Sequence, residues 1–361
     1  MLYHLLFPLR ELFAPFNVVR YLTFRTAAAV VTALVLSLLC GPWFVSKLRQ
    51  LAIGQNIREV GPQTHQVKAG TPTMGGLLIL FAWLASTLLW ANLSNAFVWM
   101  AIGVTVGFGG IGFLDDILKV RRRRNLGLTA RAKFLSLVAV ALAAGLLLPR
   151  LPAAQPFSPT LAFPFFKDLI VDLGTLYVPF VVFVLVGASN AVNLTDGLDG
   201  LAIGAAGIAA GTYAVFCYAA GNRIVAGYLQ IPSVPGVGEV TVFCGALVGA
   251  ALGFLWFNAH PAEVFMGDVG SLALGGGITI VALMTKQELL LAVVGGLFVL
   301  EALSVIVQVG SFKLRGRRVL RMAPLHHHFE LSGWAEPKII VRFWILAILF
   351  SLVALSTLKL R

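Results

Sequence analysis

Long apolar stretches recur along the whole chain, and they limit what it can fold into. About ten of them reach the ~20 residues that a helix needs to cross the hydrocarbon core of a bilayer. Each stretch is continuous rather than alternating, so helices are favoured over the strands of a barrel. Only 12% of the 361 residues are charged, against about 25% in soluble domains. The sequence therefore predicts an all-α integral membrane protein, with residues 1–361 forming a single membrane domain.

Ten transmembrane helices are predicted from these stretches. Their limits are Tyr21–Leu48, Thr73–Ala91, Phe97–Leu118, Ala130–Leu148, Leu173–Val192, Leu198–Ala220, Glu239–Phe257, Val264–Met284, Leu289–Val309 and Ile339–Leu358. The segment Pro149–Asp172, rich in proline and mixed in polarity, predicts a packed hairpin.

Lysine and arginine set the expected orientation. Three groups of loops hold 18 of the 27 basic residues. They are Lys47, Arg49, Arg58 and Lys68; then Lys119, Arg121 to Arg124, Arg131 and Lys133; then Lys313, Arg315, Arg317, Arg318, Arg321, Lys338 and Arg342. The positive-inside rule places these loops in the cytoplasm and both termini outside, although Arg10, Arg20 and Arg25 locally oppose this. The formal charge of +12 thus indicates anionic headgroups or phosphates, because these loops lack the stacking aromatics of nucleic-acid binders.

Acidic residues gather on the same cytoplasmic side. Asp115 and Asp116 end the third span, where carboxylates oppose the helix dipole and require a compensating charge such as Lys119. Adjacent side chains on a helix point about 100° apart, so only one of the two aspartates is expected to face a given site. A solvated helix end is the alternative interpretation.

Two further acidic motifs lie beside predicted spans. In Asn190–Gly200, Asp196 and Asp199 share one face if the segment is helical; if the glycines break the helix, the backbone opens toward a ligand instead. In Asn258–Ser271, Asp268 begins a helix with exposed N–H groups, either as part of a phosphate site or simply as an N-cap. Carboxylates from distant parts of the chain, surrounded by lysine and arginine, indicate Mg²⁺ held together with substrate phosphates.

Histidine and glutamate add three more observations. His326, His327 and His328 are consecutive, which suits phosphate binding or substrate positioning better than a shared zinc ion. Lys68 precedes a glycine-rich turn at the start of the second span and is placed to meet a phosphate. Glu301 lies within the ninth span, where a coupling-ion site of a transporter and a polar contact to a neighbouring helix are both open, the second being favoured.

Together these motifs resemble a known enzyme family. The segments Gly70–Gly76, Asp115-Asp116, Asn190–Gly200, Asn258–Ser271 and Pro324–His328 closely resemble the polyprenyl-phosphate N-acetylhexosamine-1-phosphate transferases, in the same order over nearly the whole chain. The stretches Lys68–Gly76 and Met322–Glu330 resemble the branch that transfers phospho-N-acetylmuramoyl-pentapeptide. The resemblance implies transfer of that group from its UDP-linked donor to undecaprenyl phosphate. Lipid I and UMP are the products, in the first membrane step of peptidoglycan synthesis.

The resemblance also implies roles for residues. Asp268 is the chief Mg²⁺ ligand, with Asp115, Asp116 and Asp196 as further ligand candidates, and Asp115 accepts a proton. The expected catalytic residues are Asp115, Asp116, Asp268 and His327. The expected substrate-binding residues are Lys68, Lys133, Asn190, Asn193, Asp196, Asp199, Asn258, Phe265, His326 and His328, with Phe265 stacking on uracil.

Several alternatives stay open at this point. The lipid phosphate attacks directly, or an aspartate first forms a covalent intermediate. A sister transferase that uses UDP-N-acetylglucosamine would share the aspartates, and a cation-coupled transporter is the least favoured class. The resemblance places the protein in the bacterial inner membrane, with its active site at the cytoplasmic membrane edge, and implies a homodimer.

Overall fold

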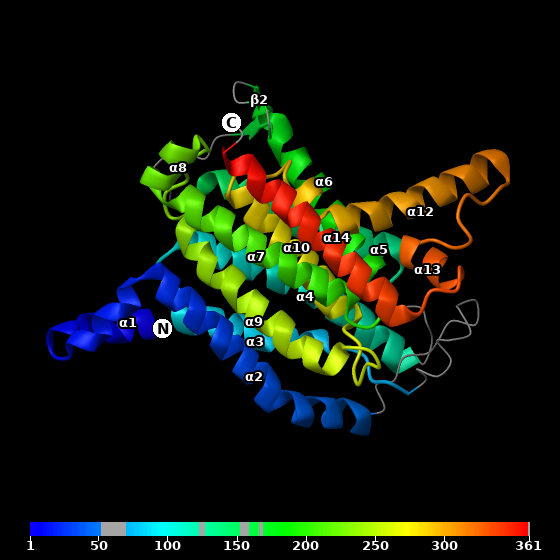
Figure 1. Ribbon diagram of the computed structural model, residues 1–361, viewed down its shortest axis with the longest axis horizontal. Coiled ribbons are helices and arrows are strands. Elements are labelled where there is room, and N and C mark those ends of the chain that lie inside the picture. The colour runs from blue at the N-terminus through cyan, green and yellow to red at the C-terminus, as the bar shows by residue number, and fades with distance from the viewer. Residues whose placement is uncertain (52–69, 123–126, 152–158, 165, 167–168, 360–361) are drawn as a thin grey trace.

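The computed structural model describes residues 1–51, 70–122, 127–151, 159–164, 166 and 169–359. It is a helical bundle in which all ten predicted apolar helices are present (Figure 1). They are α2 (Leu22–Gln50), α3 (Gly76–Trp90), α4 (Ala96–Arg122), α5 (Ala130–Leu147), α6 (Tyr177–Thr195), α7 (Leu201–Gly221), α9 (Val240–Asn258), α10 (Gly267–Met284), α12 (Gly296–Arg315) and α14 (Glu336–Ser356). Within the described ranges, nine helices are long and apolar enough to cross a membrane, whereas α3 has only 15 residues. The prediction of a multi-pass helical membrane protein is confirmed.

Short elements connect these helices. The short helices are α1 (Leu2–Leu6), α8 (Arg223–Leu229), α11 (Leu291–Val294) and α13 (Leu325–Glu330). Turns of 3-10 helix occur at Pro8–Glu11, Ala14–Arg20, Leu148–Arg150, Gly174–Leu176, Val237–Glu239 and Thr357–Lys359. The predicted hairpin is confirmed: β1 (Thr160–Ala162) pairs antiparallel with β2 (Ile170–Asp172).

The limits of α12 differ most from the sequence prediction. The helix was expected over Leu289–Val309, but it starts at Gly296, after the separate turn of α11, and continues to Arg315. Apolar length alone does not reveal the break at the glycine pair 295–296. At the other end, Lys313 and Arg315 occupy the last turn, where cations are favourable, so the helix outlasts its apolar stretch.

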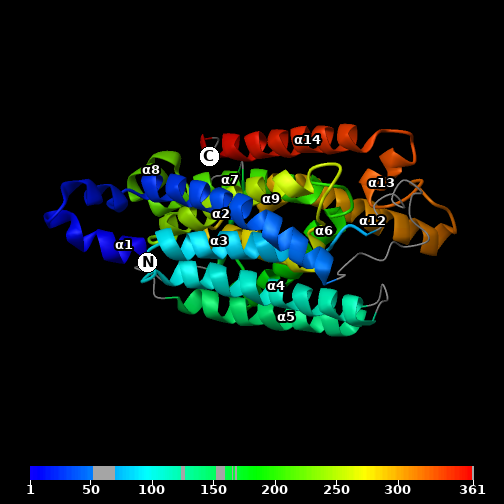
Figure 2. The same ribbon diagram turned by 90° about the horizontal axis from the view of Figure 1, so that it is seen from below.

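Helix α10 forms the centre of the bundle. In its most apolar stretch, 89% of the residues are buried inside the protein, against 17% for α12. It packs on α3, α4, α6 and α7, while α14 and α5 lie on opposite faces of the molecule (Figure 2). A residue at the start of α10 is therefore reached by several helices at once.

Glycines bring the first turn of α10 close to its neighbours. A Cβ atom on Gly112 of α4 would lie 2.2 Å from the carbonyl oxygen of Asp268, and one on Gly76 of α3 would lie 2.3 Å from the backbone nitrogen of Gly270. No side chain fits at such distances, so the close approach of these helices requires glycine. The sequence did not single out these contacts.

The other end of the bundle contains a buried ion pair. The guanidinium of Arg25 pairs with the carboxylate of Glu239 and donates to the carbonyl of Trp90 at 3.3 Å. Glu239 also accepts a hydrogen bond from the backbone N–H of Asn92 at 2.6 Å. The charge of Arg25 is neutralised inside the protein. Arg25 is therefore weak evidence against the orientation that the other basic residues predict.

The contact between α4 and α10 predicts a stability difference between two glycine variants. Gly112→Ala places a methyl group against the backbone of α10, and overpacking of this kind costs about 1–3 kcal/mol. We expect the thermal midpoint of the detergent-solubilised protein, followed by tryptophan fluorescence, to fall by several degrees. Gly110→Ala is the matched control, because a Cβ there meets no atom within 4 Å. Equal midpoints for the two variants would contradict the close contact.

Candidate functional site

Asp268 lies in the first turn of α10, as its second residue rather than its N-cap. The preceding Gly267 has φ of +74°, and a Cβ on it would lie 2.6 Å from an oxygen of Asp116. Only glycine fits this position, for conformational and steric reasons together. The glycine thus lets the carboxylates of α4 and α10 meet.

Asp115 and Asp116 both reach this meeting point. One ligand oxygen from each of Asp115, Asp116 and Asp268 lies within 4.8 Å of the others. The expectation that only one of the adjacent aspartates faces the site is wrong. Each has one oxygen held by a backbone amide, Asp116 by Val269 N–H at 3.0 Å and Asp115 by Leu128 N–H at 2.8 Å. These two segments flank the end of α4 and turn both side chains toward Asp268.

Two lysines compensate the three negative charges. The Nζ of Lys119 lies 2.7 Å from Oδ2 of both Asp115 and Asp268, and the Nζ of Lys133 lies 2.7 Å from the same oxygen of Asp268. Lys119 therefore supplies the compensating charge that the sequence called for at the end of α4. Lys133 stands one turn into α5, whose start is capped by the Thr129 hydroxyl, which accepts from Ala132 N–H at 3.2 Å.

Asn193 orients the remaining oxygen of Asp268. Its amide nitrogen donates to Asp268 Oδ1 at 2.7 Å and to the Ser271 hydroxyl at 2.7 Å. Asn193 comes from the end of α6, so this helix contributes to the cluster in addition to α4, α5 and α10. Asn190, one turn earlier, donates back to the carbonyl of Val186 at 2.8 Å and does not join it.

Asp196 and Asp199 take different places. The segment between α6 and α7 is not helical, and Gly200 adopts φ of +77°, so the interpretation that glycines break the helix is confirmed. Burial, followed by the negative charges of Asp268, Asp116 and Asp199, raises the pKa of Asp196 to about 8. Without a bound cation this carboxyl is mostly protonated at pH 7, and it does not belong to the close group around Asp268.

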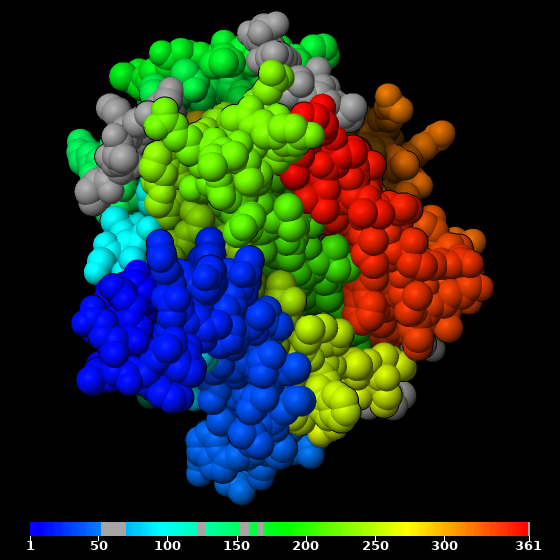
Figure 3. Space-filling view, turned by 60° about the vertical axis from the view of Figure 1, so that its left-hand side comes forward, coloured from blue at the N-terminus to red at the C-terminus, as the bar shows by residue number. Residues whose placement is uncertain are grey.

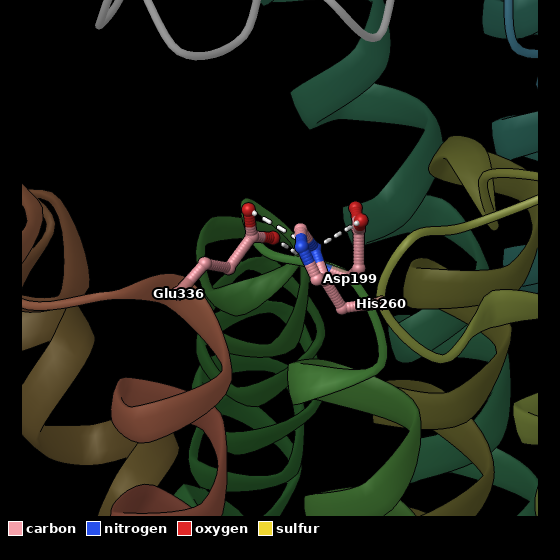
Figure 4. A group of neighbouring side chains, drawn as sticks. All are labelled: Asp199, His260 and Glu336. Carbon is pink, nitrogen blue, oxygen red and sulfur yellow. Dashed lines mark hydrogen bonds and ion pairs between the residues drawn. The ribbon is translucent and has the colours of Figure 1, made fainter.

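Asp199 belongs to a second cluster, with His260 and Glu336 (Figure 4). Nδ1 of His260 lies 3.1 Å from Asp199 Oδ2 and 3.4 Å from Glu336 Oε2. Asp199 also accepts from Ala262 N–H at 3.1 Å, and its own N–H donates to Glu336 Oε1 at 2.9 Å. The cluster ties the start of α7, the loop after α9 and the start of α14 to one another. In Figure 3 that loop, in yellow, reaches the surface between α2 and α14.

Sequence reasoning did not select His260 or Glu336 as site residues. His260 stands inside the quoted motif Asn258–Ser271, so proximity to Asp268 was an available signal. Glu336 stands in the sequence Glu-Pro, a pattern that indicates a helix start. That pattern does not predict a contact with Asp199, 137 positions away.

Asn258 and Phe265 lie beside this second cluster. The Asn258 side chain is buried; it accepts from Gly200 N–H at 3.0 Å and donates to the Val264 carbonyl at 2.8 Å. Its amide thus fixes two loops to one another. Phe265 is half-buried; its backbone N–H donates to the Pro72 carbonyl and its carbonyl accepts from Gly75 N–H, both at 2.8 Å, so the segment before α3 positions it.

The three histidines of α13 contact three different groups. His326 is fully buried, with Nδ1 3.2 Å from Glu301 Oε1. Nδ1 of His327 lies 2.6 Å from Glu330 Oε2, and Nδ1 of His328 accepts from Arg321 N–H at 3.2 Å. The prediction that they do not share one ion agrees with this arrangement.

Glu301 contacts α13, the histidine helix, from the second turn of α12. Its carboxylate accepts from the backbone N–H of His326 at 3.3 Å, so the interpretation as a polar contact to a neighbouring helix is confirmed. The other edge of the His326 ring meets the turn after α6, where a Cβ on Gly197 would lie 2.3 Å from Nε2. The histidine helix is therefore packed directly on the Asn190–Gly200 segment. Lys68, by contrast, lies outside the described residues.

The donor set around Asp268 fits a hard divalent cation. Three carboxylates converge, and in the structure the ammonium groups of Lys119 and Lys133 balance their charge. Carboxylate oxygens are the donors that Mg²⁺ takes in proteins, usually one or two of them with phosphate oxygens completing the shell. The arrangement is therefore suited to hold a cation and an anionic phosphate side by side.

Comparisons with known proteins agree with this chemistry. Residues 98–286 match the family described as glycosyl transferase family 4, and residues 68–80 match signature 1 of phospho-N-acetylmuramoyl-pentapeptide-transferase. Proteins named phospho-N-acetylmuramoyl-pentapeptide-transferase are similar over the full length of both chains. Those of Geobacter sp. (strain M21), Nitratidesulfovibrio vulgaris (strain DP4) and Syntrophus aciditrophicus (strain SB) are 59%, 62% and 57% identical.

The packing of His326 on Gly197 predicts a change in histidine accessibility. Gly197→Ala adds a methyl group that the His326 ring must move away from. We expect diethyl pyrocarbonate, with modified peptides quantified by mass spectrometry, to modify His326 several-fold faster in this variant than in the wild type. Gly187→Ala is the matched control, since a Cβ there meets nothing within 4 Å, and the exposed His260 serves as the internal standard. Equal protection of His326 in both variants would contradict the contact.

Proposed function

This chain belongs to the phospho-N-acetylmuramoyl-pentapeptide-transferase family, and from that premise we propose that the Asp115–Asp116–Asp268 cluster is its catalytic centre. The enzyme forms lipid I in peptidoglycan synthesis. One observation carries the proposal: carboxylates from α4 and α10 meet two lysines at one end of a membrane bundle. A membrane-end site suits a reaction between a lipid phosphate and a soluble nucleotide.

The cluster would hold Mg²⁺ through Asp268, Asp115 and Asp116. When bound, the ion would neutralise charge on the diphosphate oxygens as the bond to UMP breaks. Asn193 holds Asp268 in the required orientation through its 2.7 Å hydrogen bond. Because it does not belong to the close group of carboxylates around Asp268, Asp196 contributes to phosphate binding in our proposal, and it stays a further candidate as metal ligand.

The chain's own groups account for the transfer itself. An oxygen of the undecaprenyl phosphate attacks the sugar-linked phosphorus; the bond from that phosphorus to UMP breaks, and UMP leaves with the electron pair. Asp115 accepts the proton of the acceptor phosphate, and Lys119 and Lys133 bind the phosphate oxygens with the ammonium groups they direct at the site. Direct transfer is the route we propose, and a covalent intermediate on an aspartate is the alternative.

The nucleotide-sugar is proposed to bind between α10 and the histidine helix. Phe265 is the candidate for stacking on uracil, since its ring is half-exposed and its backbone is fixed by the segment before α3. His327 and His328 stand on the same short helix, and Asp199 lies on the adjoining turn. The proposed substrate-binding residues also include Lys68, Asn190, Asn258 and His326. Of these, Asn258 and His326 are buried and act by positioning the segments that they contact.

The proposed location is the inner membrane, with the cluster facing the cytoplasm and both termini outside. The basic ends of α2, α4 and α12 lie at the same end of the bundle as Asp268, which is the distribution that the positive-inside rule predicts. The N-terminal ammonium donates to the carbonyl of Leu88, at the far end of α3, so that terminus lies at the opposite end. A homodimer remains a prediction from the family resemblance.

Replacing the central ligand is the test of this proposal. Asp268→Asn keeps the shape of the side chain but removes a charge that the metal and both lysines require. We expect UMP release from UDP-N-acetylmuramoyl-pentapeptide and undecaprenyl phosphate to fall by at least about 100-fold. Wild-type activity should likewise disappear with a chelator and return with Mg²⁺.

A matched control separates chemistry from folding. Asp172→Asn makes the same chemical change in the exposed strand β2, far from the cluster, and should leave turnover unchanged. The thermal midpoint of Asp268→Asn is measured in parallel, so that loss of activity in a folded protein is established. Near-normal turnover in Asp268→Asn would remove this residue as the principal ligand.

A further inference from the structure

A second feature at the same end of the bundle has no part in the proposed reaction. An apolar groove of about 450 Å³ is lined by residues of α2 and α4, among them Phe44 and Ile117, together with Met74 and Leu77 around the start of α3. Among the described residues that line it, the charged ones are Lys47 on α2 and Arg121 on α4. We refer to it as the α2–α4 groove. Its volume falls in the range of about 300–1,000 Å³ that small-molecule sites occupy.

The groove exists because α3 is short. Helix α3 begins at Gly76, whereas α2 continues to Gln50 and α4 to Arg122, so the two long helices extend past the start of the short one. The segment before α3 does not simply continue as a helix: Met74 has φ of +71°, which is unusual for a residue with a side chain. Met74 is nonetheless buried and lines the groove. The groove therefore depends on the unusual backbone conformation of Met74, which the surrounding structure holds in place, and not on loose packing of the helices.

The groove and the catalytic cluster lie on different sides of α4. Phe113, Ile117 and Arg121 are four residues apart and share one face of the helix. By the 100° step per residue, Asp115 and Lys119 lie roughly 160° around the helix axis from the centre of that face, and Asp116 lies roughly 100° from it. A molecule in the groove thus lies on the side of α4 away from Asp115 and Lys119, the proton acceptor and one of the phosphate-binding lysines of the proposed reaction.

Charge and position indicate what fills the groove. Lys47 and Arg121 are both exposed, and in the described part of the chain neither forms an ion pair. Both line the same apolar space, at the end of the bundle where the basic residues gather. Trp43, also lining the groove, is 67% exposed, as expected of an aromatic residue at a membrane interface. An apolar chain with a negative headgroup matches all three features.

We propose that the α2–α4 groove binds an anionic phospholipid of the cytoplasmic leaflet. One acyl chain occupies the apolar space over Met74 and Leu77, and the phosphate lies between Lys47 and Arg121. The lipid contacts α4 on the side opposite to Asp115. This inference does not depend on the proposed reaction, since none of its residues belongs to the catalytic cluster.

The test measures lipid binding to the purified full-length protein by native mass spectrometry, with phosphatidylglycerol and phosphatidylcholine as probes. Lys47→Gln/Arg121→Gln removes both cations, each of which contributes about tenfold or less to the attraction of an anionic lipid. We expect the affinity for the tightest phosphatidylglycerol to fall by about 30-fold and that for phosphatidylcholine to change little. Lys313→Gln/Arg315→Gln, with the same charge change on the exposed end of α12, is the matched control and should bind as the wild type does.

A second variant tests the apolar part of the site. Leu77→Trp fills the groove and should abolish the tightest binding of both lipids, whereas Val106→Trp, on an exposed part of α4, should not. Thermal midpoints confirm that all variants are folded. Wild-type affinity for phosphatidylglycerol in Lys47→Gln/Arg121→Gln or in Leu77→Trp would overturn the proposal. Displacement of the bound phosphatidylglycerol by an equal concentration of undecaprenyl phosphate would overturn it as well, because the groove would then belong to the acceptor.

Discussion

Three carboxylates held together by two ammonium groups are the interaction on which the active end of this protein depends. Asp115, Asp116 and Asp268 repel one another, and removing them from water increases that repulsion. Lys119 and Lys133 make the arrangement stable by contacting the shared region at 2.7 Å. The carboxylates can bind a metal ion, and the ammonium groups can bind the phosphate that accompanies it. The site therefore already contains both kinds of group that a metal–phosphate complex needs.

The surrounding fold serves this arrangement. Gly112 lets α4 touch the backbone of α10, Gly267 makes room for Asp116, and Gly197 makes room for the His326 ring. Each glycine stands where a side chain would separate elements that bring polar groups together. The central position of α10 follows, since its first turn receives contributions from α4, α5 and α6.

Two buried or half-buried polar contacts then fix the loops around the cluster. His260 joins Asp199 to Glu336, and Glu301 holds the backbone of His326. The first contact joins the starts of α7 and α14 through the loop after α9, and the second joins α12 to α13. On another face of α4, the short helix α3 leaves an apolar groove whose lining includes two exposed cations, Lys47 and Arg121.

The sequence by itself determined the membrane class, the ten apolar helices, the hairpin and the set of acidic motifs, because apolar length and residue type are local properties. It also led to the family, because several long motifs occur in order. It did not determine which motif residues meet. That Asp115 and Asp116 both reach Asp268, that Asp199 instead pairs with His260 and Glu336, and that the limits of α12 shift were decided by tertiary packing. Side-chain direction at a helix end depends on neighbouring backbone amides and on glycine contacts from other helices, which no local pattern records.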